Sequence, residues 1–258
     1  MLVTVVADYG TGDLAFAEVR QRIAQLLPEA EVTAVPVPAF DTVGAGFCVA
    51  QLAFGEGPPD RIVYANVAPR QDRNEPRANN AGERLAAARL ASGVLVVGVA
   101  SGASLSFLAA EGVPVRAVDV ADHGSQFRSR DVFPSALAGL ARGADDLLGD
   151  ELAVVPPPKQ AVAWTDGYGN IKTTWDTAPA PAGETVRVRV GEVVAEATVS
   201  DGVFEVRAGT MSFAPGSSGW PRGDGNGRRT WYELLSRGGD AAQLFGHPAA
   251  GTPVEIVG

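Results

Sequence analysis

The sequence predicts an α/β protein, with an N-terminal domain on a mostly parallel sheet followed by a smaller antiparallel, β-barrel-like domain. Over about the first 150 residues, short apolar runs alternate with segments of helical spacing, which is the pattern of α/β layers. The helical period ends at Val155-Pro156-Pro157-Pro158, a stiff linker by composition. Alternating valines and arginines then indicate antiparallel strands. We therefore expect one domain at residues 1–155 and a second at 156–258.

The N-terminal domain is expected to begin with a strand, because residues 2–7 are apolar and rich in β-branched side chains. A first helix follows, since Phe16, Val19 and Ile23 recur at helical spacing before Pro28. The remaining strands are expected at 31–37, 61–67, 94–99 and 113–120, and the remaining helices after Asp41 and over 132–148. The runs at 61–67 and 94–99 are the kind buried in a parallel sheet.

The C-terminal domain is expected to consist of short strands. Residues 186–190 alternate valine with arginine and are expected to form a strand. After a turn at Gly191, residues 193–199 are expected to form a second strand that runs antiparallel to it. Further strands are expected at 202–207 and 253–257. Residues 215–229 are rich in Gly, Ser and Arg, which predicts a long mobile loop.

Composition excludes several classes of function. The chain of 258 residues has a formal charge of −9, which argues against nucleic acid, since binding a phosphate backbone needs basic patches. No apolar run approaches the roughly 18 residues that span a membrane. The start lacks the basic region of a signal peptide, so a cytoplasmic protein is expected. His123 and His247 are the two histidines and lie far apart, so no metal site is expected.

Two polar stretches of the N-terminal domain are candidates for a ligand site. Residues 8–13, Asp-Tyr-Gly-Thr-Gly-Asp, follow the first strand, and ligands of open α/β sheets bind at the carboxyl ends of strands. Asp8 can accept both hydroxyls of a ribose, or the stretch is a turn with an N-capping aspartate. Residues 126–133 lead into a helix. There, Asp131 suits a helix start, and Arg130 can pair with it.

Two further stretches lie in the C-terminal domain. Residues 164–175 hold Asp166, Tyr168 and Asn170 in one short loop. These side chains suit an ammonium group and a flat base, or the loop is a tight exposed turn. Residues 236–246 contain paired glycines whose backbone can read the edge of an adenine; otherwise they form a helix start capped near Asp240.

Taken in order, the four stretches resemble the family of S-adenosylmethionine hydrolases (hydroxide adenosyltransferases) and fluorinases/chlorinases. That family opens with Asp-x-Gly-Thr-x-Asp, continues with Thr-Phe-x-Gly/Ser-Arg-Asp and Asp-x-Phe-Gly-Asn, and ends with an Asn-x-Gly-like turn before an Ala-x-x-Leu-Gly helix. The resemblance runs from Val3 to Val257. It implies S-adenosylmethionine as substrate, no separate cofactor, and a homotrimer whose sites lie between one subunit's N-domain and a neighbour's C-domain.

The resemblance also implies roles for particular residues. Asp8 would hold the ribose, and Phe40 would wall the site. Asp166, Tyr168 and Asn170 would contact methionine and adenine, and the base would meet the backbone of the turn that contains Ser236, Arg237 and Gly238.

This chain departs from the hydrolase pattern around the attacking water. Ala68 stands where the hydrolases carry Asp, and Arg128 where they carry His; Arg73 or Arg77 can fill the role of their Arg. Ser129 occupies a position that is Gly in the hydrolases and Ser in the fluorinating branch.

The catalytic candidates are therefore Ser129, Arg128 and Arg73. The expected reaction is displacement at ribose C5′ by water, giving adenosine and methionine. The alternatives are a halide-using enzyme of the same family and a non-catalytic relative that binds S-adenosylmethionine or another adenosine compound.

Overall fold

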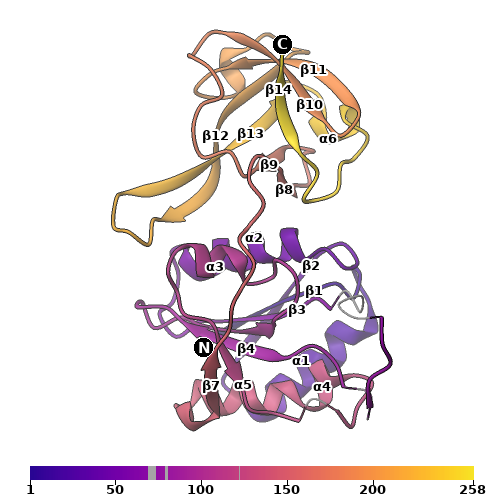
Figure 1. The fold of residues 1–258 in the computed structure, drawn as a ribbon, viewed down its shortest axis with the longest axis vertical. Coiled ribbons are helices and arrows are strands. Elements are labelled where there is room, and N and C mark those ends of the chain that lie inside the picture. The colour runs from indigo at the N-terminus through magenta and orange to yellow at the C-terminus, as the bar shows by residue number, and fades with distance from the viewer. Residues whose placement is uncertain (69–73, 79–80, 122) are drawn as a thin grey trace. The chain divides into compact units, whose positions relative to one another are not determined.

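The computed structural model describes residues 1–68, 74–78, 81–121 and 123–258 (Figure 1). The chain folds into two compact units, Met1–Pro157 and Pro158–Gly258, so the division falls inside the proline run. Each unit is built on one seven-stranded sheet. Helices accompany the first sheet, and the second is curled. The fold is thus of the mixed α/β class.

The sheet of the first unit has the order β2-β1-β3-β5-β4-β6-β7. Its strands are β1 (Leu2–Ala7), β2 (Glu31–Pro36), β3 (Ile62–Asn66), β4 (Leu85–Arg89), β5 (Leu95–Val99), β6 (Arg116–Val118) and β7 (Leu148–Glu151). Strands β2, β1, β3 and β5 pair in parallel. Strand β4 is antiparallel to both neighbours, and β7 is antiparallel to β6. The parallel pairing expected from the sequence therefore holds for one half of this sheet.

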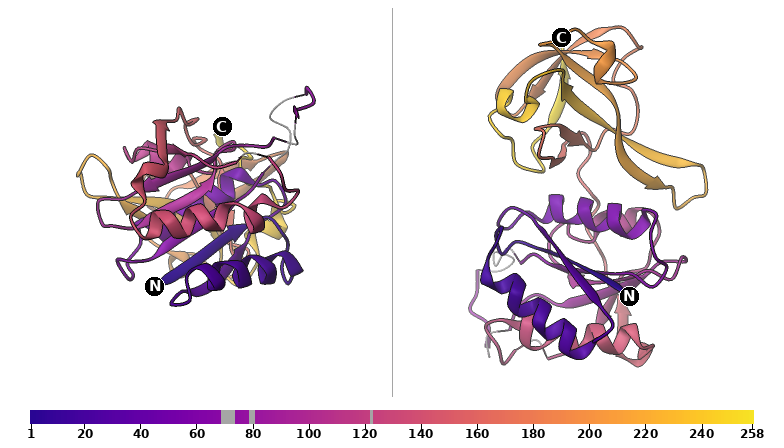
Figure 2. Two further views of the ribbon diagram at one scale, coloured as in Figure 1. Left: turned by 90° about the horizontal axis from the view of Figure 1, so that it is seen from below. Right: turned by 180° about the vertical axis from the view of Figure 1, so that it is seen from behind.

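Helices cover both faces of this sheet (Figures 1 and 2). One face carries α1 (Leu14–Leu26), α4 (Arg128–Asp131) and α5 (Phe133–Ala141), and the other carries α2 (Thr42–Phe54) and α3 (Ser106–Ala110). The predicted helix 132–148 divides into α5, the short 3-10 turn Asp145–Leu147 and strand β7. It ends early because Gly143, at φ 88°, adopts the left-handed conformation that terminates helices.

Each long helix of the first unit has an aspartate at its N-terminus. Asp13 accepts a hydrogen bond from Ala15 N at 2.8 Å, and Asp41 accepts one from Gly44 N at 2.7 Å. At the other end of α2, the buried Arg61 donates to the carbonyl oxygens of Leu52 and Ala53. These contacts fix the ends of α2 against the sheet, because they satisfy backbone groups that lack a partner within the helix.

Asp41 gives this unit a pH-dependent stability. Burial raises the pKa of its carboxyl above the ordinary 3.8, although the amides of Gly44 and Val43 oppose the shift. A carboxyl with a raised pKa in the folded state contributes stability at low pH that is lost as the pH rises through that pKa. Asparagine keeps the cap but cannot ionise. We therefore expect Asp41→Asn to gain stability relative to the wild type between about pH 3 and pH 7.

Urea unfolding midpoints at the two pH values measure this effect. The control is Asp13→Asn, the same change at the exposed cap of α1. A relative stability of the Asp41 variant that stays constant or falls as the pH rises would contradict the expectation.

The second unit has the strand order β14-β10-β11-β12-β13-β9-β8. Its strands are β8 (Val162–Thr165), β9 (Ile171–Thr173), β10 (Thr185–Val190), β11 (Val193–Val199), β12 (Met211–Pro221), β13 (Arg228–Ser236) and β14 (Val254–Val257). All neighbours pair antiparallel except β11 and β12, which pair in parallel. A bridge between Ala161 and Pro253 links the β8 end of the sheet back to β14, which gives the sheet its curl.

Two predictions for the second unit are wrong. The expected strand 202–207 is instead the 3-10 turn Val203–Glu205, where Glu205 accepts a hydrogen bond from the Asp201 amide. Most of the expected mobile loop 215–229 belongs to a long β12–β13 hairpin. Within that hairpin the rings of Trp220 and Trp231 pack edge to face, with 5.3 Å between the ring centres. This aromatic pair supplies the buried area that the glycines lack.

The short helix α6 (Ala241–Leu244) follows β13 and is capped by Asp240, as the sequence suggested. None of the helices in the described parts of the chain is long and apolar enough to cross a membrane.

Candidate functional site

A pocket of about 730 Å³ opens at the carboxyl ends of the parallel strands of the first unit. Segments that follow β1 and β2 supply Asp8 and Phe40, and β3 and β5 supply their last residues. The segment around α4 completes the lining. Residues far apart in the sequence line it together: Asp8, Tyr9, Asp13, Ala15, Ala39, Phe40, Asn66, Ala68, Arg77, Ala81, Gly82, Glu83, Val99, Ser125, Gln126, Phe127, Arg128, Ser129 and Phe133. This is where open α/β sheets bind their ligands.

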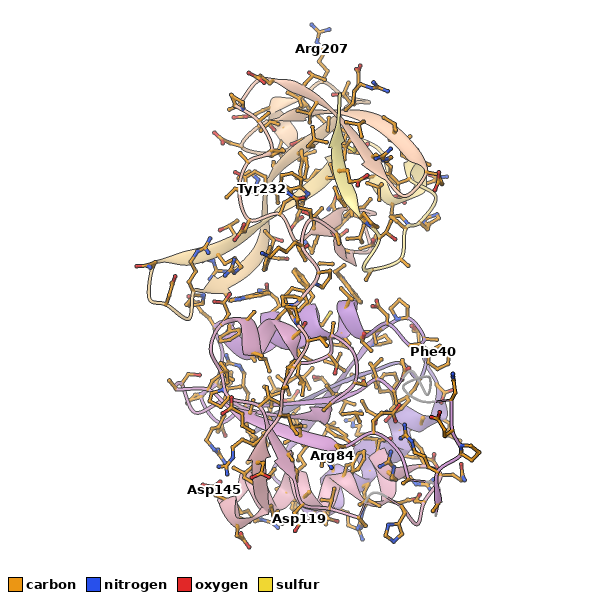
Figure 3. All side chains as sticks on the ribbon, viewed as in Figure 1. Phe40, Arg84, Asp119, Asp145, Arg207 and Tyr232 are labelled. Atoms are coloured by element: carbon orange, nitrogen blue, oxygen red, sulfur yellow. The ribbon has the colours of Figure 1, made fainter. Side chains whose placement is uncertain are left out.

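Asp8 and Phe40 are joined at the rim of this pocket. Asp8 Oδ2 accepts a hydrogen bond from the Phe40 amide at 3.0 Å. Phe40 has a φ of 64° and is 52% exposed, at the periphery of the first unit (Figure 3). A left-handed conformation is costly for a residue with a Cβ and persists only where neighbours hold it. The Asp8 carboxylate therefore holds an exposed aromatic ring at the entrance of the pocket.

Ser129 is held from two sides. Its hydroxyl oxygen accepts a hydrogen bond from the Tyr9 hydroxyl at 2.7 Å, and its carbonyl oxygen accepts one from the Tyr64 hydroxyl at 2.9 Å. Tyr64 is completely buried, and Ser129 is 5% exposed. A helix of four residues has little stability of its own. The two tyrosines, which come from the β1 end and from β3, thus fix α4 over the strand ends.

The Arg128 guanidinium also lines the pocket. Its Nη1 donates to the Glu83 carbonyl oxygen at 3.2 Å, and the group lies 5.1 Å from the centre of the Phe133 ring. Of the two arginines considered for the third catalytic position, Arg77 lines the same pocket, whereas Arg73 lies outside the described residues.

The acidic end of the same stretch has a structural role. Asp131 ends α4 rather than beginning a helix, and it forms an ion pair with Arg130 at 2.7 Å. Arg130 also pairs with Glu18 of α1 at 3.0 Å, so these charges tie α4 to α1.

The position that the family resemblance matches to the hydrolase aspartate contributes no acid here. Ala68 lies in the pocket lining beside Asn66, the last residue of β3. The carboxylates among the described lining residues are Asp8, Asp13 and Glu83, and the described lining contains no histidine. The side-chain donors on the α4 side of the pocket include those of Gln126, Arg128 and Ser129.

In the second unit, Asp166, Tyr168 and Asn170 form a tight loop between β8 and β9. Asp166 Oδ1 accepts from the amides of Tyr168 and Asn170 at 2.9 and 3.0 Å, and Oδ2 accepts from Asn170 Nδ2 at 3.1 Å. Lys172 Nζ lies 3.8 Å from the same oxygen and 2.8 Å from the buried Glu233. Asp166 thus shapes the loop, and Tyr168, 83% exposed, presents its ring to solvent.

The turn at 236–238 is largely committed to the fold. The Arg237 amide donates to Thr210 O and its carbonyl accepts from the Gly209 amide, while its guanidinium donates to the Val206 carbonyl at 2.7 Å. Ser236 ends β13, and Gly238 has a φ of 78°. The Arg237 backbone is therefore paired with residues 209–210.

The four candidate stretches gather into two clusters. Residues 8–13 and 125–129 share the pocket of the first unit. In the second unit, the Ala242 amide at the start of α6 donates to the Gly169 carbonyl at 2.9 Å. Loop 166–170 therefore packs on the segment that follows 236–239.

The fold has solved counterparts. An uncharacterized conserved protein from Thermotoga maritima is 21% identical, with 99% of this chain and 100% of that chain covered at a TM-score of 0.76. A conserved hypothetical protein from Thermus thermophilus is 24% identical, with 99% of each chain covered at a TM-score of 0.67. No protein-family model and no curated protein matches the sequence. At these identities the likeness establishes the fold of both units.

Sequence reasoning missed Tyr9 and Tyr64 as site residues. Tyr9 lies inside the first candidate stretch, but its partner Ser129 is 120 residues away. Tyr64 is the one polar side chain in the apolar run of β3 before Asn66. A hydroxyl in a buried strand requires a partner, and that requirement is the signal that marks Tyr64.

Proposed function

We propose that this protein binds S-adenosylmethionine and hydrolyses it to adenosine and methionine by direct displacement at ribose C5′. One observation carries the proposal: Asp8, Phe40, Arg128 and Ser129, to which the family resemblance assigns ligand-holding or nucleophile-side positions, line a single pocket. Its volume of about 730 Å³ lies in the range of sites for small molecules and cofactors.

The proposed reaction makes modest demands on acid–base chemistry. The water oxygen forms a bond to C5′ while the C5′–S bond breaks, and the electron pair stays on sulfur, which leaves as a neutral thioether. The attacking water releases its proton to solvent. The protein must place the water in line with the breaking bond and keep other water away. Ser129 or Arg128 can donate a hydrogen bond to one lone pair of that water, while its other lone pair forms the bond to C5′.

The assignment divides the ligand between the two clusters of residues. Asp8 accepts the ribose hydroxyls, and Phe40 covers the sugar and base from the rim. Tyr168 and Asn170 of the second unit take the remainder of the ligand. Following the family resemblance, we propose that the two units are separate domains and that a homotrimer brings one subunit's pocket to a neighbour's loop 166–170.

Product analysis tests the proposal. Purified protein is incubated with S-adenosylmethionine, and the mixture is separated by chromatography with mass detection. We expect adenosine and methionine to appear together above a control without protein. Ligand that stays intact while co-eluting with the protein would replace the hydrolase with a binding protein.

A halide-using enzyme is the second candidate, and the donors beside α4 favour it. Ser129 and Arg128 line the pocket together, and a hydroxyl and a guanidinium are both suited to an anion. The same incubation with added chloride, bromide or fluoride discriminates the two. A 5′-halogenated adenosine would establish the halide-using enzyme. Formation of adenosine that added halide does not alter would support the hydrolase.

A further inference from the structure

Tyr9 is fixed in one orientation beside the pocket. Its ring packs edge to face on the rings of Phe16 of α1 and Phe127, with distances between ring centres of 5.0 and 5.7 Å. The ring is thus held between the first helix and the segment that leads into α4, and only its hydroxyl reaches Ser129. Because aromatic neighbours on two sides restrict the ring, the hydroxyl position is set by the fold rather than by a ligand.

The hydrogen bonds of the Ser129 hydroxyl can be counted. A serine hydroxyl donates one proton and accepts through two lone pairs. The Tyr9 phenol is the donor in their 2.7 Å contact, so it occupies a lone pair and leaves the serine proton uncommitted. Among the described residues, no other side chain or backbone group bonds this hydroxyl. Ser129 lines the pocket, so the pocket is where its proton has room to find an acceptor.

The Tyr9 phenol stays protonated over the ordinary pH range. Burial raises its pKa well above 10.0, the bond to Ser129 lowers it by less, and the charge of Asp8 raises it again. Tyr64 lies under the same turn and donates to the Ser129 carbonyl oxygen, so it holds the backbone and leaves the hydroxyl to Tyr9. A protonated Tyr9 acts on Ser129 only as a donor.

We propose that Tyr9 is a positioning residue that directs the Ser129 hydroxyl proton into the pocket. Ser129 is thereby available as a donor to one lone pair of the incoming nucleophile. The inference rests on the proposed displacement at C5′ and assigns that reaction a residue beyond Ser129 itself. This role explains why a serine suits position 129: Tyr9 donates to the hydroxyl and does not accept its proton, which stays available to the nucleophile.

Tyr9→Phe tests this role, because phenylalanine keeps the ring contacts and removes the hydroxyl alone. We expect a single-turnover rate about 10-fold lower, with an affinity for S-adenosylmethionine changed less than about 2-fold. Added to Ser129→Ala, the same change is expected to cause no further loss, because it acts through that serine. Tyr232→Phe, which removes a tyrosine hydroxyl in the second unit, is the control and should match the wild type.

Two results would overturn the proposal. One is a Tyr9→Phe loss that persists at full size in the Ser129→Ala background. The other is a loss of affinity equal to the loss of rate, which is the sign of a structural defect. If the wild type shows no turnover, the displacement fails, and chlorine NMR line broadening with chloride as the probe decides the role of Tyr9. Line broadening that both Tyr9→Phe and Ser129→Ala reduce would support the role of Tyr9. No broadening in the wild type, or broadening that Tyr9→Phe leaves unchanged, would refute it.

Discussion

Replacing Asp8 with alanine is expected to lower the affinity for S-adenosylmethionine about 100-fold, because two hydrogen bonds from ribose hydroxyls to a charged acceptor contribute about 3 kcal/mol together. The same carboxylate holds the Phe40 amide at 3.0 Å. Its loss therefore also frees an aromatic ring whose left-handed backbone needs that contact. Isothermal calorimetry measures the affinity.

Asp8→Asn separates the two roles of this carboxylate. Asparagine keeps an oxygen that accepts from the Phe40 amide but weakens the bonds to the ribose, because it lacks the charge. We expect an affinity between those of the wild type and the alanine variant. Unchanged affinity of the Asp8→Ala variant would contradict the contact between Asp8 and the ribose, and with it the assignment of this pocket as the ligand site.

Replacing Ser129 is expected to slow turnover about 100-fold with little change in affinity, as for the loss of a donor to a transition state. Ser129→Ala removes the hydroxyl, and Ser129→Gly restores the residue typical of the resembled hydrolases. Ser135→Ala, on the exposed side of α5, is the matched control. Single-turnover rates and calorimetry give the two quantities. A Ser129 variant that loses affinity for S-adenosylmethionine but keeps its turnover rate would contradict the proposed contact between Ser129 and the nucleophile.

Alternation of strand and helix predicted the first unit well where side-chain patterns are strong. Strand β4 escaped prediction because Leu-Ala-Ala-Ala-Arg has neither β-branched side chains nor alternation. It forms a strand through backbone pairing with β5 and β6, and its alanines are buried on the faces of the sheet. The β12–β13 hairpin escaped for the opposite reason. Its glycines and prolines signal a loop, whereas long-range pairing and the Trp220–Trp231 contact make it a strand pair.

The candidate site was predictable in outline and not in its contacts. Asp8 follows a strand and Ser129 lies in the short helix α4, and the sequence predicted that both would face a ligand. The Tyr9–Ser129 bond joins residues 120 positions apart, which no local pattern encodes. In the second unit, the sequence allowed Asp166 either to meet an ammonium group or to shape a tight turn, and its carboxylate accepts from the Tyr168 and Asn170 amides of its own loop. Local hydrogen bonding of this kind competes with ligand binding for the same oxygens.

Displacement at C5′ by water is tested most directly with water labelled with heavy oxygen. Purified protein is incubated with S-adenosylmethionine in the labelled water, and the adenosine formed is analysed by mass spectrometry. Attack of water on C5′ predicts that the heavy oxygen appears in the 5′-hydroxyl of adenosine, while methionine carries none. Adenosine without the label, or no adenosine at all from ligand that the protein demonstrably binds, would contradict the proposed reaction.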